Sequence, residues 1–264
     1  YSQCYSRIAK KYIMKVVAIV QARLNSVRLP GKVMKQICGV PMIGLLLKRL
    51  SLAKKIDQIV VATSNHESNK ELVEYIQKEK YQVFIGSDIN VLERYYNAAI
   101  KYKTDVVVRV TADNPLTDPE LADYLVKIFH KSDKDFVSFG SPPNYPLGLT
   151  VEVINFSALK KCYELVESDF DKEHVTSYLK HSGKFSILNL ECDEVYSNQR
   201  LTVDEEDDFQ VIKSVFEYFQ PNINFGWPKI LELLKKKPEL FERNKHVLQN
   251  FLHKRGRHFA HIKR

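Results

Sequence analysis

Three cations lie together in one loop that directly follows an apolar stretch. The segment IVQARLNSVRLPGKV (19–33) runs into Arg23, Arg28 and Lys32, and Gly31 allows the backbone to approach a ligand closely. Such a cluster can bind a polyphosphate, although cations on an exposed loop can also be merely solvated. The loop lacks both the G-x-x-x-x-G-K-[ST] and the G-x-G-x-x-G motifs, which argues against a P-loop NTPase and against a nicotinamide cofactor.

Two aspartates each follow an apolar stretch that is expected to be a strand. Asp113 comes directly after VVVRVTA, and Asp204 comes directly after RLTV. Carboxylates at the ends of neighbouring strands can share Mg²⁺, a hard cation that takes oxygen ligands. Together with cations for the phosphates, they are the groups that phosphoryl or nucleotidyl transfer needs. The alternative is that each aspartate only caps the helix after it.

Alternating strands and helices must position these residues. Strands are expected at 15–21, 57–64, 81–86, 105–112, 135–140, 151–156, 185–190 and 199–203. Helices are expected at 41–53, 67–80, 88–102, 118–131, 157–167, 170–182 and 204–219, with Asp88 as the N-cap of the third. This alternation predicts an α/β protein with a mostly parallel sheet. In that class ligands bind beyond the carboxyl ends of the strands, where the cationic loop and both aspartates are expected.

Length and composition narrow the class of protein. The chain has 264 residues, of which 44% are hydrophobic, and this is enough for a sizeable core. No apolar run approaches the roughly 18–20 residues of a membrane span, and the basic start of the chain lacks the apolar segment of a secretory signal. The four cysteines, Cys4, Cys38, Cys162 and Cys192, have no C-x-x-C spacing. Neither a zinc site nor a disulfide framework is indicated, and the cytoplasm is the expected location.

The net charge of +8 is confined to the two ends of the chain. Residues 1–13 and 230–264 carry the basic excess, whereas the segment between them is slightly acidic. Nucleic-acid-binding domains more often spread basic charge over a folded face, so nucleic acid is disfavoured as a partner. Residues 1–13, which precede Met14 and the first strand, are expected to lie outside the working domain.

The stretch QARLNSVRLPGKVMKQICGVPMIGLLLKRL resembles the nucleotide-binding signature of sugar cytidylyltransferases. The resemblance is greatest to the spore-coat polysaccharide biosynthesis branch, which is related to the 3-deoxy-manno-octulosonate and acylneuraminate cytidylyltransferases. It continues through IVVATS, GSDINVLERYYNAA, VVRVTADNPLTDP, LGLTVEV, EHVTSYL and RLTVDEEDDFQVI, over about residues 14–250. It implies a Rossmann-like nucleotidyltransferase domain at 14–228 and a helical C-terminal extension at 229–264, with a basic tail from about 251.

The resemblance also implies roles for residues on the nucleotide side. Arg23, Arg28 and Lys32 would hold the triphosphate, and Asp113 and Asp204 would bind Mg²⁺. The other residues implied at the nucleotide are Ala22, Leu24, Gly31, Thr63, Ser64, Gly86, Ser87, Asp88, Thr111 and Ala112. Arg94 could reach the nucleotide as well, or it could form an ion pair on the helix surface.

On the acceptor side, the resemblance implies Glu152, His174 and Arg200. A lone histidine on a helix is as often structural as functional, whereas Arg200 could bind a carboxylate or phosphate through two parallel hydrogen bonds. The loop departs from the family pattern at Asn25 and Val27, where small Gly and Thr residues are usual. Val27 lacks a hydroxyl that could contact phosphate.

These features predict Mg²⁺-dependent transfer of CMP from CTP to a sugar or sugar acid, for surface polysaccharide or glycan biosynthesis, with release of pyrophosphate. Arg23, Lys32, Asp113 and Asp204 would be the catalytic residues. Two alternatives stay open: a catalytically quiet nucleotide- or sugar-binding module that recruits partners through its basic tail, and a nucleic-acid-binding protein, whose affinity would fall steeply with salt. A homodimer is compatible with the resemblance, with 141–156 as a candidate arm.

Overall fold

The structure is a computed structural model, and it describes residues 13–139, 145–191, 196 and 199–247. Within these residues a seven-stranded sheet has the strand order β5-β4-β1-β6-β8-β7-β9. The strands of this sheet are β1 (Val16–Gln21), β4 (Gln58–Ser64), β5 (Gln82–Gly86), β6 (Val106–Thr111), β7 (Phe136–Phe139), β8 (Glu152–Asn155) and β9 (Ile187–Leu190). A separate antiparallel ribbon is formed by β2 (Gln36–Ile37) and β3 (Val40–Pro41), which the sequence patterns did not predict.

The sheet is mostly parallel, as expected. Strands β5, β4, β1 and β6 run parallel to one another, and β8 is antiparallel to both of its neighbours, β6 and β7. The edge strand β9 is parallel to β7. The carboxyl ends of β1, β4 and β6 therefore meet at one edge of the sheet, which is where ligands bind in this fold class.

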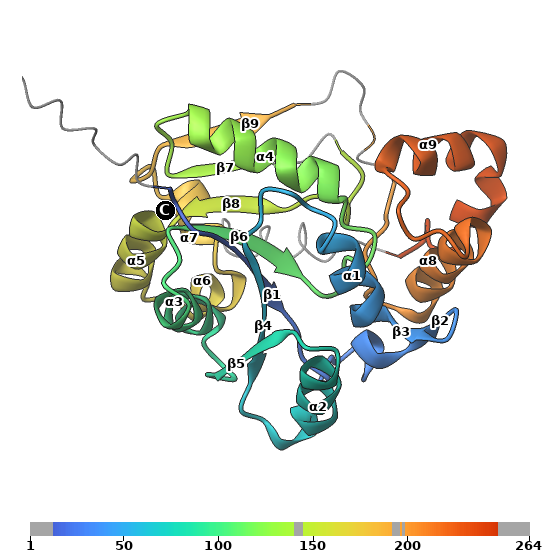
Figure 1. Ribbon diagram of the computed structural model, residues 1–264, viewed down its shortest axis with the longest axis horizontal. Helices are drawn as coiled ribbons and strands as arrows, with labels where there is room; N and C mark the ends of the chain where they lie inside the picture. Colours follow the sequence, from blue (N-terminus) through green and yellow to red (C-terminus); the bar gives the residue numbers. More distant parts are fainter. Residues whose placement is uncertain (1–12, 140–144, 192–195, 197–198, 248–264) are drawn as a thin grey trace, which may run out of the picture.

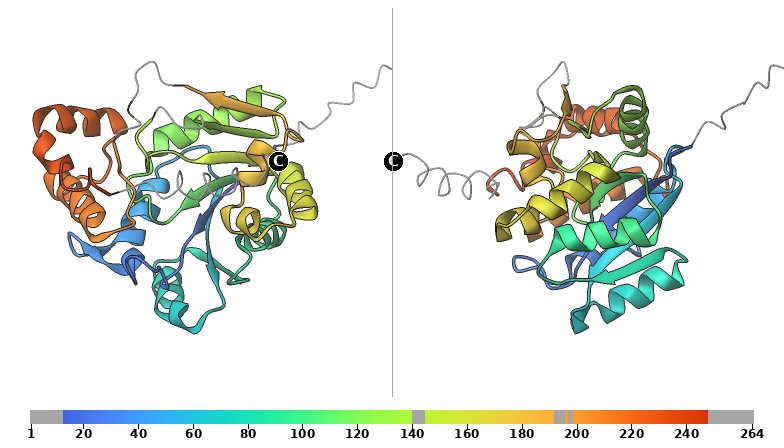
Figure 2. Two further views of the ribbon diagram at one scale, coloured as in Figure 1. Left: turned by 180° about the vertical axis from the view of Figure 1, so that it is seen from behind. Right: turned by 90° about the vertical axis from the view of Figure 1, so that its left-hand side faces the viewer.

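Helices cover both faces of the sheet (Figures 1 and 2). One face carries α1 (Met42–Leu50), α2 (Lys70–Lys78), α4 (Pro119–Lys131), α8 (Glu206–Phe219) and α9 (Trp227–Lys236). The other face carries α3 (Val91–Lys101), α5 (Phe156–Leu165), α6 (Asp169–His174) and α7 (Ser177–His181). Strand β1 shows why both faces need cover, because Val16 and Ala18 pack into one hydrophobic cluster while Val17 and Ile19 pack into the other.

Short 3₁₀ turns connect several of these elements. They are η1 (Lys32–Met34), η2 (Glu67–Asn69) and η3 (Pro238–Phe241). Helix α4 begins as expected, because the Asp118 carboxylate accepts the N–H groups of Glu120 and Leu121. For α3 the expected N-cap is wrong. The side chain of Asn90, and not that of Asp88, accepts the N–H of Glu93.

Two further expectations are corrected by the structure. Residues 199–203 form no strand, and only a single bridge joins Arg200 to Leu147. The helix expected at 170–182 is divided into α6 and α7 at Val175, whose φ is 58°. A positive φ is unfavourable for a β-branched residue, so this break is imposed by the surrounding packing rather than by local preference.

The last described helices pack onto the rest of the chain. Figure 1 shows α8 and α9 gathered at one end of the molecule. Ile230, Leu233 and Phe241 are buried in the same hydrophobic cluster as β1, and the guanidinium group of the buried Arg49 donates to the Ile223 carbonyl at 2.6 Å. Residues 229–247 thus share the core of the preceding residues, while 1–12 and the basic tail from 251 lie outside the described part.

The candidate dimer arm falls only partly within the described residues. Of 141–156, residues 141–144 lie outside the described part, and Glu152–Asn155 form the internal strand β8. Among the described residues, none of the helices combines the length and apolar character that a membrane crossing requires.

Candidate active site

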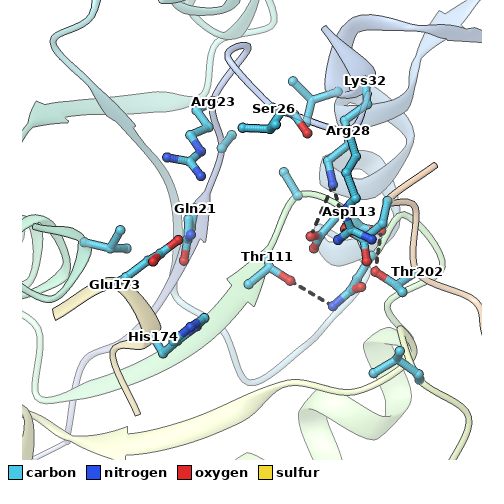
Figure 3. Close-up of a pocket in the computed structure, with 18 of the residues that line it drawn as sticks. Gln21, Arg23, Ser26, Arg28, Lys32, Thr111, Asp113, Glu173, His174 and Thr202 are labelled. Atoms are coloured by element: carbon cyan, nitrogen blue, oxygen red, sulfur yellow. Dashed lines mark hydrogen bonds and ion pairs between the residues drawn. The ribbon is translucent and has the colours of Figure 1, made fainter. Parts of the chain in front are cut away.

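A cavity of about 550 Å³ opens at the carboxyl ends of β1 and β6. Figure 3 shows the side chains that converge on it from the loop after β1, from the end of β6 and from α6. The predicted site residues on its wall are Ala22, Arg23, Arg28, Lys32, Thr111, Ala112, Asp113, His174, Arg200 and Asp204. The fold thus brings together residues from widely separated segments of the chain.

Main-chain hydrogen bonds hold the loop after β1 in shape. The Gly31 N–H donates to the Leu24 carbonyl at 2.8 Å, and Gly31 has a φ of 69°, which glycine adopts without strain. The Leu24 N–H donates to Asn69 Oδ1 at 2.8 Å, which ties the loop to the segment after β4. The loop therefore presents its cations from a fixed backbone.

Lys32 is the point at which the two predicted metal ligands meet. Its side chain is buried, and Nζ donates to the Val203 carbonyl at 2.6 Å. The same Nζ lies 3.2 Å from Asp204 Oδ1 and 3.5 Å from Asp113 Oδ2. The alternative that the loop cations are merely solvated is therefore wrong for Lys32. Arg23 also lines the cavity (Figure 3).

Asp204 is surrounded by cations. Besides Lys32, Arg28 Nη2 lies 2.9 Å from Oδ1 and Arg200 Nη2 lies 2.7 Å from Oδ2. Burial by itself raises the pKa of the Asp204 carboxyl, but Lys32, Arg28 and Arg200 outweigh it and hold the pKa below its usual range. Asp204 is therefore an anion in this site.

Neither aspartate caps a helix. The N-cap of α8 is Glu205, which forms a capping box with Asp208, and the N-cap of α4 is Asp118. The capping alternative is therefore wrong for Asp113 and Asp204, and both side chains face the cavity instead.

Asp113 and Asp204 fit a hard divalent cation. Their carboxylates approach the same ammonium group from different segments, so they can also approach one metal ion. Within the described ranges, no group of three or more His, Cys, Asp or Glu side chains is arranged around a metal position. The protein would supply the two carboxylates. A bound triphosphate would supply further oxygen ligands, as is common for Mg²⁺.

Arg200 lies on the cavity wall, and its guanidinium group is bound by two carboxylates of the protein. Asp208 accepts from Nε at 2.8 Å and from Nη2 at 3.1 Å, and Asp204 accepts from the same Nη2. These acidic partners outweigh the effect of burial and raise the pKa of Arg200. The proposed contact between Arg200 and an acceptor therefore has to compete with two carboxylates.

The other end of the cavity is lined by polar side chains and one aromatic ring. His174, Glu173 and Phe170 come from α6, and Gln21 and Arg109 come from β1 and β6 (Figure 3 labels His174, Glu173 and Gln21). The exposed side chain of Glu173 forms no hydrogen bond or ion pair with any described residue. This end can hydrogen-bond hydroxyl and amino groups of a ligand.

Glu152 lies behind this wall rather than on it. It stands opposite Arg109 in the β6–β8 register, and its Oε2 lies 2.8 Å from Arg109 Nη1. Its Oε1 is paired with Lys180, and Thr176 Oγ1 donates to Oε2 at 3.0 Å. Burial by itself raises the pKa of Glu152. Lys180 and Arg109 have the larger, opposite effect, and the pKa is lowered from 4.5 to about 2.

The residues predicted around the base and ribose also lie off the wall. Thr63 and Ser64 are buried at the end of β4, where Ser64 Oγ accepts from Asn69 Nδ2 at 2.8 Å. Gly86, Ser87, Asp88, Leu24 and Gly31 are likewise absent from the lining residues. Residues 86–88 occupy the end of β5 and the turn before α3.

Arg94 forms no surface ion pair. Its side chain is buried, and Nη1 donates to the Ser87 carbonyl at 2.6 Å. Burial lowers the pKa of Arg94, and the neighbouring Arg23 adds to this effect. Arg94 thus stabilises the turn after β5 through its hydrogen bond to Ser87.

Several wall residues were not predicted from the sequence. They are Gln21, Val33, Val91, Arg109, Asn114, Leu147, Phe170, Glu173 and Thr202, whereas Ser26 and Val27 belong to the loop that was expected to bind phosphate. Arg109 had a usable signal, because it is the one charged residue in the apolar run VVVRVT of a buried strand. Glu173 stands beside His174 on a helix and has no signal of its own.

Comparisons with known proteins agree with this geometry. The profile of the cytidylyltransferase family matches residues 17–249. The chain is 37% identical to an uncharacterised protein of Methanocaldococcus jannaschii, over 89% of this chain and 97% of the relative. It is 30% identical to the spore coat polysaccharide biosynthesis protein SpsF of Bacillus subtilis, over 85% of this chain and 95% of the relative.

A solved structure shows the same fold and a related sequence. A cytidylyltransferase from Leptospira borgpetersenii is 29% identical, covers 90% of this chain and all of its own, and superposes with a TM-score of 0.85. The sequence resemblance and the Rossmann-like nucleotidyltransferase fold are thereby confirmed. This chain therefore belongs to the cytidylyltransferase family of nucleotidyltransferases.

Proposed function

We propose that the protein transfers CMP from CTP to a sugar or sugar acid, depends on Mg²⁺ and releases pyrophosphate. The observation that supports this most directly is the meeting of Asp113 and Asp204 at Lys32, beside Arg23 and Arg28. Cations for a triphosphate and carboxylates for a metal lie on one cavity wall. The similarity to SpsF supports an acceptor destined for a polysaccharide.

The charges of the site complement those of a metal–triphosphate. Arg28 and Lys32 form ion pairs with Asp204. On binding, phosphate oxygens would take over these cations, and Mg²⁺ would neutralise charge on the phosphates next to Asp113 and Asp204. The exchange keeps every charge paired, which matters most for Lys32 and Asp204, whose side chains are largely buried.

In the reaction, an acceptor oxygen forms a bond to the α-phosphorus, and the bond between that phosphorus and the oxygen bridging to the β-phosphate breaks. The electron pair leaves with pyrophosphate. Arg23 and Lys32 stabilise the negative charge that develops there, and Arg28 holds the outer phosphates. If the acceptor oxygen is a hydroxyl, its proton passes to a solvent water as the new bond forms. Positioning and electrostatics supply the rate enhancement.

The acceptor is assigned to the end of the cavity formed by Gln21, Arg109, Glu173 and His174. Figure 3 shows Gln21, Glu173 and His174 on the other side of Thr111 from Asp113, and Arg109 also lines the cavity. Their donors and acceptors suit the hydroxyl groups of a sugar.

The experiment is a thermal shift with Mg²⁺ and each of CTP, UTP, GTP and ATP, followed by pyrophosphate release with a panel of sugars and sugar acids. A ligand that binds only the folded state stabilises it by about 2.7 kcal/mol at a hundredfold excess over its dissociation constant. A shift selective for CTP with Mg²⁺, then acceptor-dependent pyrophosphate release, is expected. Equal shifts with all four nucleotides, or none, would contradict the proposal.

A further inference from the structure

We propose that Asn244 is a positioning residue, which acts through Asp208 and Arg200 to hold the Asp204 carboxylate in place for the metal–nucleotide complex. The inference rests on the proposed function, and it goes beyond it by giving the segment after η3 a part in the site. Neither Asn244 nor Asp208 lines the cavity, so any effect on ligand binding has to pass through their neighbours.

The first step is the contact between the C-terminal segment and α8. Asn244 is 3% exposed. Its Nδ2 donates to Asp208 Oδ1 at 2.9 Å and to the Arg200 carbonyl at 3.0 Å. One amide group therefore holds the Arg200 main chain and the carboxylate that binds the Arg200 side chain.

The second step is the fixing of the Arg200 guanidinium. Asp208 is fully buried and binds it through both oxygens, at 2.8 Å and 3.1 Å. Asp208 Oδ2 also accepts the N–H groups of Asp204 and Glu205, at 2.9 Å and 3.1 Å. A carboxylate with this many donors is rigid, and a two-point contact fixes the plane of the guanidinium as well as its position.

The third step is the contact between Arg200 and Asp204. Arg200 Nη2 lies 2.7 Å from Asp204 Oδ2, while Arg28 and Lys32 bind Oδ1. When a triphosphate takes Arg28 and Lys32, Arg200 is the cation that stays with Asp204. The orientation of the carboxylate then depends on Arg200, and hence on Asp208 and Asn244.

The test uses Asn244→Ala in the full-length chain, with Arg243→Ala as the matched control. Arg243 is the preceding residue and binds Asp207 at 2.7 Å on the surface, so its removal weakens the same segment without touching Asp208. The readouts are Mn²⁺ affinity in the presence of CTP, by calorimetry or by the EPR signal of free Mn²⁺, and CTP affinity in EDTA.

We expect Asn244→Ala to weaken Mn²⁺ binding about tenfold, which is the usual effect of losing a group that orients a metal ligand. CTP affinity in EDTA should change less than about twofold, and Arg243→Ala should match the wild type in both readouts. Asn244→Asp keeps the shape of the side chain but places a second carboxylate against Asp208. It should therefore weaken Mn²⁺ binding more than Asn244→Ala does. A purely space-filling role predicts the reverse order.

A double-mutant cycle with Arg200→Lys tests the route of the effect. If Asn244 acts through Arg200, then Asn244→Ala should add less than about twofold in the Arg200→Lys background. The inference would be overturned if the losses of the two variants multiply, or if Asn244→Ala and Arg243→Ala have equal Mn²⁺ affinity. If the wild type still binds CTP and Mn²⁺, the proposed function stands in either case. A wild-type chain that binds neither ligand overturns both.

Discussion

The two ends of the cavity handle charge in opposite ways. At the end lined by Arg28, Lys32, Asp113 and Asp204, here called the phosphate end, Arg28 and Asp113 are about a third exposed. Each forms an ion pair with a more buried partner, Asp204 or Lys32. At the acceptor end, Arg109 is paired with Glu152 behind the wall, where both side chains are less than a fifth exposed. The first set of ion pairs can be exchanged for a ligand, whereas the second is a permanent part of the sheet.

The difference follows from where the residues stand in the fold. Arg28 and Asp113 lie on loops beyond the ends of strands, and Arg28 also lies 3.6 Å from the exposed carboxylate of Glu205. Arg109 and Glu152 are cross-strand partners inside the sheet. Separating a buried pair leaves an unpaired charge at high cost, whereas separating an exposed pair costs little. Ligand binding should therefore rearrange the phosphate end and leave the acceptor end unchanged.

The largest effect that separates the two ends is expected for Asp113→Ala. Pyrophosphate release should fall about a hundredfold or more, because a proposed ligand of the metal ion that would stabilise the developing charge is lost. The free energy of unfolding should change by less than about 1 kcal/mol, since the Asp113 side chain is 30% exposed and only faces Lys32 at 3.5 Å. Asp207→Asn, on the surface of α8, is the control. Near-wild-type turnover in Asp113→Ala would remove Asp113 from the metal site.

The opposite pattern is expected for Glu152→Gln, with a loss of stability at pH 7 of about 3 kcal/mol. The folded-state pKa of Glu152 is lowered from 4.5 to about 2, so its contribution is present above about pH 4.5 and is lost as the pH falls toward 2. In urea unfolding, the wild type and the variant should therefore converge over that range. Glu173→Gln, which removes an exposed carboxylate at the same end, is the control. A difference between wild type and variant that does not change with pH would contradict the assignment.

The smallest effect is expected at the tip of the phosphate loop. Val27 lines the cavity mouth and is 91% exposed, so Val27→Thr adds a hydroxyl without disturbing the core. CTP should bind about two- to threefold more tightly by calorimetry, because one exposed hydrogen bond contributes little. A gain of tenfold or more would mean that the loop tip, rather than the buried Lys32, limits phosphate binding.

The sequence patterns predicted much of the fold, because burial on both faces of a parallel sheet leaves short apolar runs and helical spacing. They were wrong where tertiary contacts override local preference. Residues 199–203 have the sequence pattern of a strand, but they form only a single bridge, between Arg200 and Leu147. Val175 has a positive φ and interrupts the helix expected at 170–182. Asn90 rather than Asp88 caps α3, since both residue types suit the position and only the path of the turn decides.

What the sequence predicted by itself is most of the cavity end that we propose to bind the triphosphate. A cationic loop and a carboxylate that follow parallel strands must meet at one sheet edge, which is why Arg23, Arg28, Lys32 and Asp113 could be named from the sequence. Asp204 was named from an expected strand at 199–203 that the structure does not contain, although its side chain does line the same cavity. Only the tertiary structure decided the acceptor end and the support of Asp204. Arg109 and Glu152 meet through strand register, and Asn244 reaches Asp208 from a distant segment. Contacts of this kind arise from the packing of remote elements, and no local pattern in the sequence encodes them.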